Sequence, residues 1–381
     1  MPFKPSTNAT PAQAQPLYVQ ADSLKGRGSG WAIAHRYQNE LREQYDDGWG
    51  SLVQEAGEEH LPPSTQIIEE RAKSIISSNQ SPDISFDTSI NPYRGCEHGC
   101  IYCFARPTHS YLNLSPGIDF ETKIIAKVNA AERLRASFAS PSYQPRSLCI
   151  GTATDAYQPV ERKLGITRAL IEVLAEHGHP FSMVTKSSGI ERDLDLIAPM
   201  AARNLASVYL SVTTLDPALA RILEPRAAAP HRRLRTIETL AQAGVPVGVS
   251  VSPLIPFLNE PELERILEAA AAAGARAAFS IPLRLPWEVN PLFQDWLQRH
   301  YPDRAARVMA RLREMRGGRD NDPRFGSRMS GEGLWAQLIA QRLKKASQRF
   351  GLTRERVVLD LSQFRRPTAM PAGGGRQGEL F

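Results

Sequence analysis

Cys96-Glu-His-Gly-Cys100-Ile-Tyr-Cys103 holds three of the four cysteines of this 381-residue chain. Cysteine thiolates bind iron–sulfur clusters, and a [4Fe–4S] cluster ordinarily takes four of them. The remaining cysteine, Cys149, lies 46 positions beyond Cys103 in an apolar run. The C-x3-C-x2-C spacing therefore predicts a cluster with three local protein ligands and one iron open to another ligand.

Two other uses of clustered cysteines fit this pattern less well. A structural zinc site normally has four ligands in paired spacings, whereas only His98 accompanies the cysteines here, inside the loop. Disulfide frameworks are typical of small secreted chains. This chain is long and shows no secretory pattern after Met1. The iron–sulfur interpretation is therefore favoured.

Length and composition limit the class of protein. A chain of 381 residues can form one large domain or two. No apolar run reaches the roughly 18 residues expected of a membrane helix, so we expect no membrane span. Unpaired thiols without a targeting signal favour a cytoplasmic location. The net charge of +6 permits a polyanionic partner, but a soluble basic surface explains it equally well.

Short β-prone runs alternate with helical patterns after residue 80. The expected strands are Ile84–Ile90, Ser147–Gly151, Phe181–Thr185, Ser207–Thr213, Val245–Val251 and Arg276–Ile281. The expected helices between them are Glu121–Phe138, Leu164–His177, Arg192–Ala201, Arg232–Ala243 and Pro261–Ala273. This alternation predicts βαβ units and a parallel sheet. We therefore predict an α/β fold, a partial (β/α)6 TIM-like barrel with an N-terminal extension and C-terminal helices.

The pattern also predicts a division of the chain. We expect residues 1–80 to form a partly disordered extension, 81–290 the barrel, 291–364 a C-terminal helical region and 365–381 a disordered tail. The cysteine loop then follows the first barrel strand. Because the active sites of such barrels lie at the carboxyl ends of the strands, this placement suits a functional site.

The cysteine motif resembles that of the radical S-adenosylmethionine (SAM) superfamily. In that family three cysteines hold a [4Fe–4S] cluster, and SAM chelates the unique iron through its amino and carboxylate groups. Tyr102 matches the aromatic that the family places before the third cysteine, where it lines the adenine pocket. Further segments follow the later strands: Gly151-Thr-Ala-Thr-Asp155, Val184-Thr-Lys186-Ser187, Leu210-Ser211 and Val251-Ser-Pro253. Over about residues 80–290 the chain resembles the spore photoproduct lyase-like branch, also called DNA repair photolyase-like.

The resemblance implies roles by position. It makes Cys96, Cys100 and Cys103 the cluster ligands. The other implied contacts are to SAM: Thr154 and Asp155 with the amino group, Lys186 and Ser211 with the carboxylate end, and Val251 and Pro253 with adenine.

Structural roles remain open for several of these residues. Asp155 and Lys186 can form an ordinary loop ion pair, and Ser211 can be a plain strand-end hydroxyl. Cys149 fits an inert buried thiol. Tyr157, Gln158 and Glu161 lie where substrate can approach, although a structural loop role is equally consistent.

One position departs from the branch. Spore photoproduct lyases place a hydrogen-donating cysteine three residues before the aspartate, where this chain has Thr152. A thiol donates hydrogen atoms readily and a hydroxyl does not. We therefore do not expect this chain to reverse thymine dimers in the same way.

The resemblance implies an enzyme. A reduced cluster cleaves SAM, and the resulting 5′-deoxyadenosyl radical abstracts a hydrogen from substrate, with electrons from a flavodoxin- or ferredoxin-like donor. Damaged DNA is the expected substrate, which makes a lyase or another DNA repair enzyme the first interpretation. RNA and protein substrates remain alternatives. A non-catalytic iron–sulfur redox or binding module is the alternative from another class.

The last five residues carry a second motif. Gln377-Gly-Glu-Leu380-Phe381 follows a glycine-rich linker and resembles the Q-x-x-L-F peptides that dock on the bacterial sliding clamp. A flexible segment with two apolar anchors can order on binding. Its second position is glycine rather than the usual leucine-like residue. Clamp binding through Gln377, Leu380 and Phe381 is therefore a further hypothesis.

Overall fold

A curved, mainly parallel sheet forms the centre of the fold. The computed structural model describes residues 26–37, 64–84 and 86–367, and every structural statement below concerns these residues. The sheet has seven strands in the order β10-β9-β8-β7-β6-β3-β2. Their bounds are β2 Ile76–Ser78, β3 Thr88–Ile90, β6 Leu148–Ile150, β7 Phe181–Thr185, β8 Ala206–Ser211, β9 Val247–Leu254 and β10 Ala277–Pro282. All neighbouring pairs are parallel except β2 with β3.

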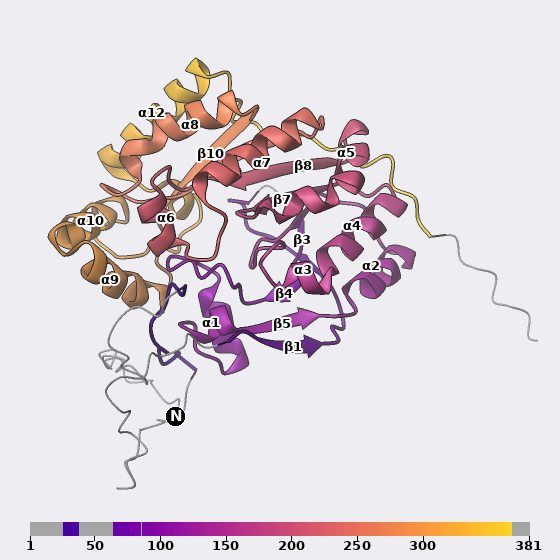
Figure 1. Cartoon of the computed structure of the whole chain (residues 1–381), viewed down its shortest axis with the longest axis horizontal. Coiled ribbons are helices and arrows are strands. Elements are labelled where there is room, and N and C mark those ends of the chain that lie inside the picture. The colour runs from indigo at the N-terminus through magenta and orange to yellow at the C-terminus, as the bar shows by residue number, and fades with distance from the viewer. Residues whose placement is uncertain (1–25, 38–63, 85, 368–381) are drawn as a thin grey trace, which may run out of the picture.

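The sheet confirms the predicted fold class. Each of the six expected strands is present, and β7 has the predicted bounds. Helices lie between consecutive strands and cover the outer face, as Figure 1 shows: α4 Ile166–Glu176, α5 Leu194–Ala202, α7 Pro230–Gln242 and α8 Leu263–Ala272. Shorter helical turns are η1 Arg106–Leu112, α1 Asp119–Thr122, α3 Glu161–Leu164, η2 Ser188–Asp193, α6 Pro217–Leu223 and η3 Glu260–Glu262.

One expected helix was wrong in its first half. The helical pattern assigned to Glu121–Phe138 contains strand β5, Lys123–Lys127, and only its second half is helical, as α2 Ala130–Ala139. β5 pairs in parallel with β1 Gln66–Glu70 and antiparallel with β4 Tyr93–Arg94. Two adjacent β-branched isoleucines in β5 favour the extended conformation once partner strands are present. Those partners lie far along the chain, so local periodicity missed them.

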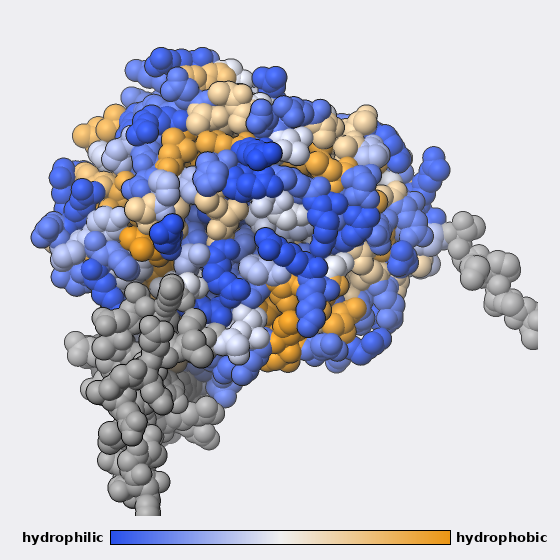
Figure 2. Space-filling model, in the orientation of Figure 1, coloured by the Kyte–Doolittle hydropathy of each residue, from blue (hydrophilic) through white to orange (hydrophobic). Residues whose placement is uncertain are grey.

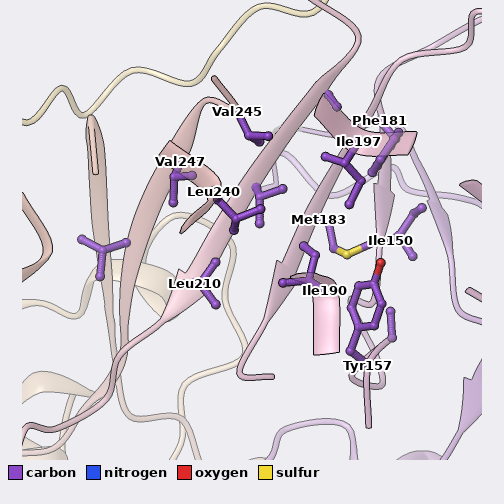
Figure 3. Packing of buried hydrophobic residues seen from close by; sticks show 14 of the residues in the cluster. Ile150, Tyr157, Phe181, Met183, Ile190, Ile197, Leu210, Leu240, Val245 and Val247 are labelled. Carbon is purple, nitrogen blue, oxygen red and sulfur yellow. The ribbon is translucent and has the colours of Figure 1, made fainter. Parts of the chain in front are cut away.

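The two faces of the barrel sheet differ in chemistry. Met183 of β7 is level with Val208 of β8, which is level with Val247 of β9, and all three are buried against the helices. Figure 3 shows Ile150, Met183 and Leu210 of the strands beside Ile190, Ile197 and Leu240 of the covering segments. The alternate positions of the strands face the barrel interior and are mostly small or polar: Ser182, Ser207, Ser211, Gly248 and Ser250. The interior therefore offers space and hydrogen-bonding groups, while the outer face supplies the core.

The C-terminal helices lie beside the barrel. They are α9 Val289–His300, α10 Pro302–Met315, α11 Ser327–Ser330 and α12 Gly333–Arg349. Figure 1 shows α9 and α10 together next to α6, and α12 next to α8. Beyond α12 the chain is extended rather than helical. It runs across the amino ends of the strands, where the Asp360 amide donates to Asn204 at 2.9 Å and the Arg365 amide to His177 at 2.8 Å.

Residues 316–332 bridge the two edges of the open barrel. At one edge, Arg316 donates to the carbonyls of Pro282 and Leu283, at the end of β10, at 3.2 and 3.0 Å. At the other edge, Arg328 forms a 2.5 Å ion pair with Asp83, in the loop after β2. The opening between β10 and β2 is therefore lined by this segment.

The visible surface is mixed in polarity. Figure 2 shows apolar residues gathered over β1 and β5, where Ile67 and Ile68 are 38% and 43% exposed. None of the helices in the described ranges is both long enough and apolar enough to cross a membrane.

Replacement of Phe138 tests the packing at the amino ends of the barrel strands. Its buried ring stacks on His179 at 4.9 Å between centroids and meets Phe364 of the C-terminal segment edge-on at 5.3 Å. Phe138→Ala should lower the free energy of unfolding by about 3–5 kcal/mol, because it removes apolar contacts and leaves a cavity. Denaturant unfolding followed by circular dichroism measures this. Leu334→Ala, at a 78% exposed position, should change it by less than about 0.5 kcal/mol, and equal effects would contradict the assignment.

Candidate metal centre

The three clustered cysteines lie on a loop after β3 and β4, at the carboxyl ends of the barrel strands. Cys96 and Cys100 are buried, Cys103 is partly buried, and all three are free thiols. Burial raises the pKa of Cys100 to about 12, and Glu224 and Cys103 act in the same direction while Lys186 opposes them. Burial, together with nearby negative groups, also raises the pKa of Cys96. Burial and nearby negative charge thus disfavour the thiolates in the free protein. A bound cationic metal centre stabilises them, because thiols that coordinate a metal are deprotonated.

The arrangement of the thiols bears on the kind of metal that fits. Across the described ranges, no three His, Cys, Asp or Glu side chains are close enough to bind a single metal ion. Four converging ligands are what structural zinc requires. In a [4Fe–4S] cluster each thiolate binds a different iron, so the thiols need not converge on one point. Three free thiols on one loop, two of them buried, therefore fit a cluster.

A buried arginine holds the cysteine loop in shape. The Arg106 guanidinium donates to the carbonyls of Cys100 at 2.9 Å, Gly99 at 3.2 Å and Gly117 at 2.9 Å. It also pairs with Glu121 at 2.5 Å, and both side chains are fully buried. A buried ion pair is retained only when hydrogen bonds satisfy its remaining groups, as they do here. The loop is therefore fixed by contacts from outside the motif.

An N-terminal segment covers this loop. The backbone amides of Gly28 and Ser29 donate to the two carboxylate oxygens of Glu121 at 2.9 and 2.8 Å. Gly28 lies so close to the loop that a Cβ there would sit 1.7 Å from the carbonyl oxygen of Gly99. The amide of Ile118 donates to the Trp31 carbonyl at 3.2 Å. Residues 26–37, expected to be part of an extension, thus belong to the site.

The loop after β6 contacts the cysteine loop directly. The Thr154 hydroxyl donates to the Gly95 carbonyl at 2.6 Å and accepts from the Gln158 amide at 3.0 Å. The side-chain oxygen of Gln158 accepts from the Glu97 amide at 2.9 Å. Both Thr154 and Gln158 are buried, so these bonds determine how the two loops meet.

Asp155 joins three loops through one carboxylate. One oxygen accepts from the Tyr157 amide at 2.9 Å and the Thr185 hydroxyl at 2.7 Å. The other accepts from the Lys186 amide at 2.8 Å and lies 3.3 Å from Nδ1 of His98. Burial acts to raise the pKa of Asp155, but His98 and these donors outweigh it and hold that pKa well below its usual range. With four neighbours, this carboxylate has few lone pairs left for a ligand.

Lys186 lies beside the cysteines with its ammonium group uncommitted. Its contact with Asp155 is through the backbone amide, and its Nζ lies 5.8 Å from the centroid of the Tyr102 ring. Burial acts to lower the pKa of Lys186, but the negative fields of Cys100 and Glu224 outweigh it and the pKa is raised. No carboxylate in the described ranges pairs with this ammonium group. The expected alternative of a Lys186–Asp155 side-chain ion pair is therefore not what the structure contains.

Glu224 is the counter-charge that the sequence did not single out. It accepts from the Tyr102 hydroxyl, accepts from Thr213 at 2.6 Å and pairs with Arg233 at 2.5 Å. Burial acts to raise the pKa of Glu224, but Arg233 and Lys186 outweigh it and lower it to about 2. A buried carboxylate with these partners stays ionised and fixes the Tyr102 ring beside the cysteines. Glu224 and Arg233 come from segments whose meeting only the fold creates.

The remaining predicted residues lie at the ends of β8 and β9. Ser211 is buried, and its carbonyl accepts from Arg233 at 3.0 Å. Its hydroxyl makes no hydrogen bond to any described residue. The Val251 side chain is buried in the outer core, so a ligand on the inner face would meet only its backbone. The Pro253 carbonyl accepts from the Asn259 amide at 2.9 Å.

Three residues that sequence analysis left open have structural surroundings. Tyr157, Gln158 and Glu161 are all buried. Tyr157 donates to Asp193 at 2.8 Å, and Glu161 pairs with Arg192 at 2.8 Å. These side chains are therefore engaged in contacts within the fold, and Tyr157 and Glu161 also line a pocket with Ser188 and Glu191.

Two positions relevant to hydrogen transfer also have defined surroundings. Thr152 lies at the end of β6, where its hydroxyl accepts from Asn91 at 3.3 Å. Cys149 lies three residues earlier, level with Ser89 and Ser182 of the neighbouring strands. Burial raises the pKa of Cys149 to about 11, so this thiol stays protonated.

Other proteins resemble this chain in sequence and in fold. The sequence model of the radical SAM superfamily matches residues 90–270. An uncharacterized protein of Mycobacterium tuberculosis is 38% identical over 234 residues, which are 61% of this chain and 68% of that protein. One of Methanocaldococcus jannaschii is 25% identical over 197 residues, 52% of this chain and 71% of that protein. A mutant spore photoproduct lyase with bound AdoMet and dinucleoside spore photoproduct superposes with a TM-score of 0.54 at 16% identity, over 77% of this chain and 82% of that one.

Gly28 tests whether the N-terminal segment supports the cysteine loop. Gly28→Ala should push residues 26–37 off the loop, because its Cβ has no room beside the Gly99 carbonyl. We expect a loss of roughly 1–3 kcal/mol in stability and severalfold less iron retained after anaerobic reconstitution. Leu334→Ala is the control, since Leu334 is 78% exposed on α12, outside this segment. Equal iron retention in both variants would contradict the role of the segment.

Proposed function

The chain belongs to the radical SAM superfamily, and from that premise we propose that it uses its cysteine loop to activate SAM against a nucleic-acid substrate. The family uses a [4Fe–4S] cluster and SAM. We propose Cys96, Cys100 and Cys103 as the cluster ligands. The observation that carries the proposal is the partly buried ammonium group of Lys186, which pairs with no carboxylate of the described chain and lies beside three clustered thiols at the carboxyl ends of barrel strands.

The surroundings of each residue assign its part in holding SAM. Lys186 would bind the carboxylate as a point charge, and Ser211 offers a free hydroxyl at the same end of the barrel. Asp155 is already saturated, so it would act by fixing the loop that carries Lys186. Direct contact with the amino group would then fall to Thr154. Tyr102, Val251 and Pro253 would border adenine, Val251 through its backbone.

The chemistry divides between cofactor and protein. The reduced cluster supplies the electron that cleaves the SAM sulfonium and generates the radical that abstracts a substrate hydrogen. The protein buries the cysteine loop with Arg106, Glu121 and residues 26–37, and thereby limits access of water. The small polar side chains of the inner sheet face leave room for SAM. A flavodoxin- or ferredoxin-like protein is the proposed electron donor.

A nucleic-acid substrate is supported by two observations. The fold resembles that of spore photoproduct lyase, whose structure holds a dinucleoside photoproduct, and the chain carries a net charge of +6. Thr152 in place of a hydrogen-donating cysteine separates the proposed reaction from that of the lyase. Clamp docking through Gln377, Leu380 and Phe381 lies outside the described residues and stays a proposal from sequence, as does a cytoplasmic location.

SAM cleavage separates this enzyme from a non-catalytic iron–sulfur module. Anaerobically reconstituted protein should hold about four irons per chain and, once reduced with dithionite in the presence of SAM, should release 5′-deoxyadenosine detectable by chromatography. Cys100→Ala should release none above the protein-free background. Cys149→Ala is the matched control and should retain both iron and turnover. Full turnover by Cys100→Ala, or none by wild type with an intact cluster, would refute the proposal.

Lys186→Ala tests the carboxylate contact. It removes a charge-assisted contact worth roughly 1.5–3 kcal/mol, so SAM affinity should fall by roughly one to two orders of magnitude. Titration of SAM, followed by electron paramagnetic resonance of the reduced cluster, measures the affinity. Lys163→Ala, at an exposed position on α3, is the charge control. Iron content should be unchanged in both variants, and equal SAM affinities would reject this role for Lys186.

A further inference from the structure

Arg284 follows the last barrel strand, β10, and has no anionic partner. Its side chain is partly buried. Nη1 lies 3.4 Å from the sulfur of Met329, a weak acceptor. Nε is buried without any hydrogen-bond partner. Arg284 therefore lies at the end of β10, against the bridging segment, with its Nε donor unused.

The carboxylates around this opening are already paired with other arginines. Their ion pairs are Asp83–Arg328 at 2.5 Å, Asp320–Arg313 at 2.7 Å, Asp322–Arg324 at 2.9 Å and Glu332–Arg324 at 3.2 Å. Nearby Arg316 is held by backbone carbonyls alone. Burial and the charge of Arg328 lower the pKa of Arg284, and the opposite charge of Asp83 offsets them only in part. None of the described carboxylates forms an ion pair with Arg284.

An unpaired, partly buried cation is unfavourable in the free protein. Groups of this kind are normally paired or hydrogen-bonded. A guanidinium group matches a phosphate in geometry and binds it through two parallel hydrogen bonds. A phosphate would therefore supply what Arg284 lacks.

An exposed aromatic ring lies on the bridging segment, residues 316–332, which Arg284 contacts through Met329. Phe325 is 61% exposed, and the Arg328 guanidinium lies 4.5 Å from its ring centroid. Arg328 is held in turn by Asp83. Such a ring, supported on one side by a cation, is a platform on which a base can stack.

We propose that Arg284 and Phe325 form a nucleic-acid contact at the opening between β10 and β2. Arg284 binds a backbone phosphate, and Phe325 stacks against the base of a single-stranded or extruded nucleotide. This rests on the proposed function and adds to it the surface that holds the strand. The combination of an unpaired guanidinium and an open aromatic face favours nucleic acid over an acidic peptide, which offers charge but no base.

The test measures binding separately from SAM chemistry. Reconstituted wild type, Arg284→Ala and Arg284→Gln are titrated into a fluorescein-labelled single-stranded DNA of mixed sequence, and then into the matching RNA, by fluorescence anisotropy at several salt concentrations. Both variants should bind roughly tenfold more weakly or worse, and the log–log salt slope should become about one unit shallower. Arg265→Ala is the matched control, because Arg265 is exposed on α8 without an ion pair in the described chain.

Phe325 is tested in the same assay. Phe325→Ala and Phe325→Leu should both weaken single-strand binding by roughly five- to a hundredfold, because leucine restores apolar volume but not a stacking face. Their salt slope should match that of wild type. Wild-type affinity in Phe325→Leu would overturn the stacking contact.

Three further outcomes would overturn the phosphate contact. These are an Arg284 variant indistinguishable from Arg265→Ala, a salt slope unaffected by Arg284, and equal displacement of the DNA by poly-glutamate. Because Arg284 makes no ion pair in the described chain, its variants should unfold at wild-type denaturant concentrations, and Arg284→Gln retains more of the side chain than alanine does. Release of 5′-deoxyadenosine from SAM is measured on the same samples. If wild-type protein releases no 5′-deoxyadenosine, the proposed function is refuted, while the result of the binding assay still stands.

Discussion

Three thiols can be held together away from water only if the loop that carries them is fixed by other parts of the chain. The cysteine loop has no helix or sheet of its own to satisfy its backbone. Arg106 donates hydrogen bonds to the carbonyls of the loop, and Glu121 forms an ion pair with Arg106. The backbone amides of Gly28 and Ser29 donate to the carboxylate of Glu121. Loss of one partner of a buried ion pair leaves an uncompensated charge and strongly destabilises the fold, so each of these groups depends on the others. The geometry of the metal centre thus depends on this network.

The parallel sheet supplies the other half of the site. Its outer face carries the aliphatic core, so the inner face is free to hold serines, glycines and the strand-end residues that meet the cysteine loop. Asp155 links the ends of β6 and β7 to that loop through Thr185, Lys186 and His98. One saturated carboxylate therefore fixes the backbone from which the Lys186 side chain extends. Stability and cofactor recognition share the same contacts here.

Segments outside the barrel complete its two ends. Residues 26–37 cover the cysteine loop, and residues 316–332 cross the opening between β10 and β2. The first segment closes the metal centre from one side. The second carries the exposed ring of Phe325 and contacts Arg284, where we propose that a substrate strand binds. At each end, groups that satisfy one another thus surround a few that do not: Lys186 and Ser211 beside the cysteines, and Arg284 at the opening.

The sequence by itself determined the fold class, four of the five helices expected between the strands, and the cysteine loop. Those signals are local, because strand and helix periodicity and the spacing of Cys96, Cys100 and Cys103 are all read within short windows. It misassigned Lys123–Lys127, whose strand character depends on pairing with Gln66–Glu70. It also gave no warning that Glu224 and Arg233 would pair beside Tyr102, or that Gly28 would touch Gly99. Those contacts join residues far apart in the chain, and only the tertiary structure decides which buried charges meet and which, like Arg284, are left without a partner.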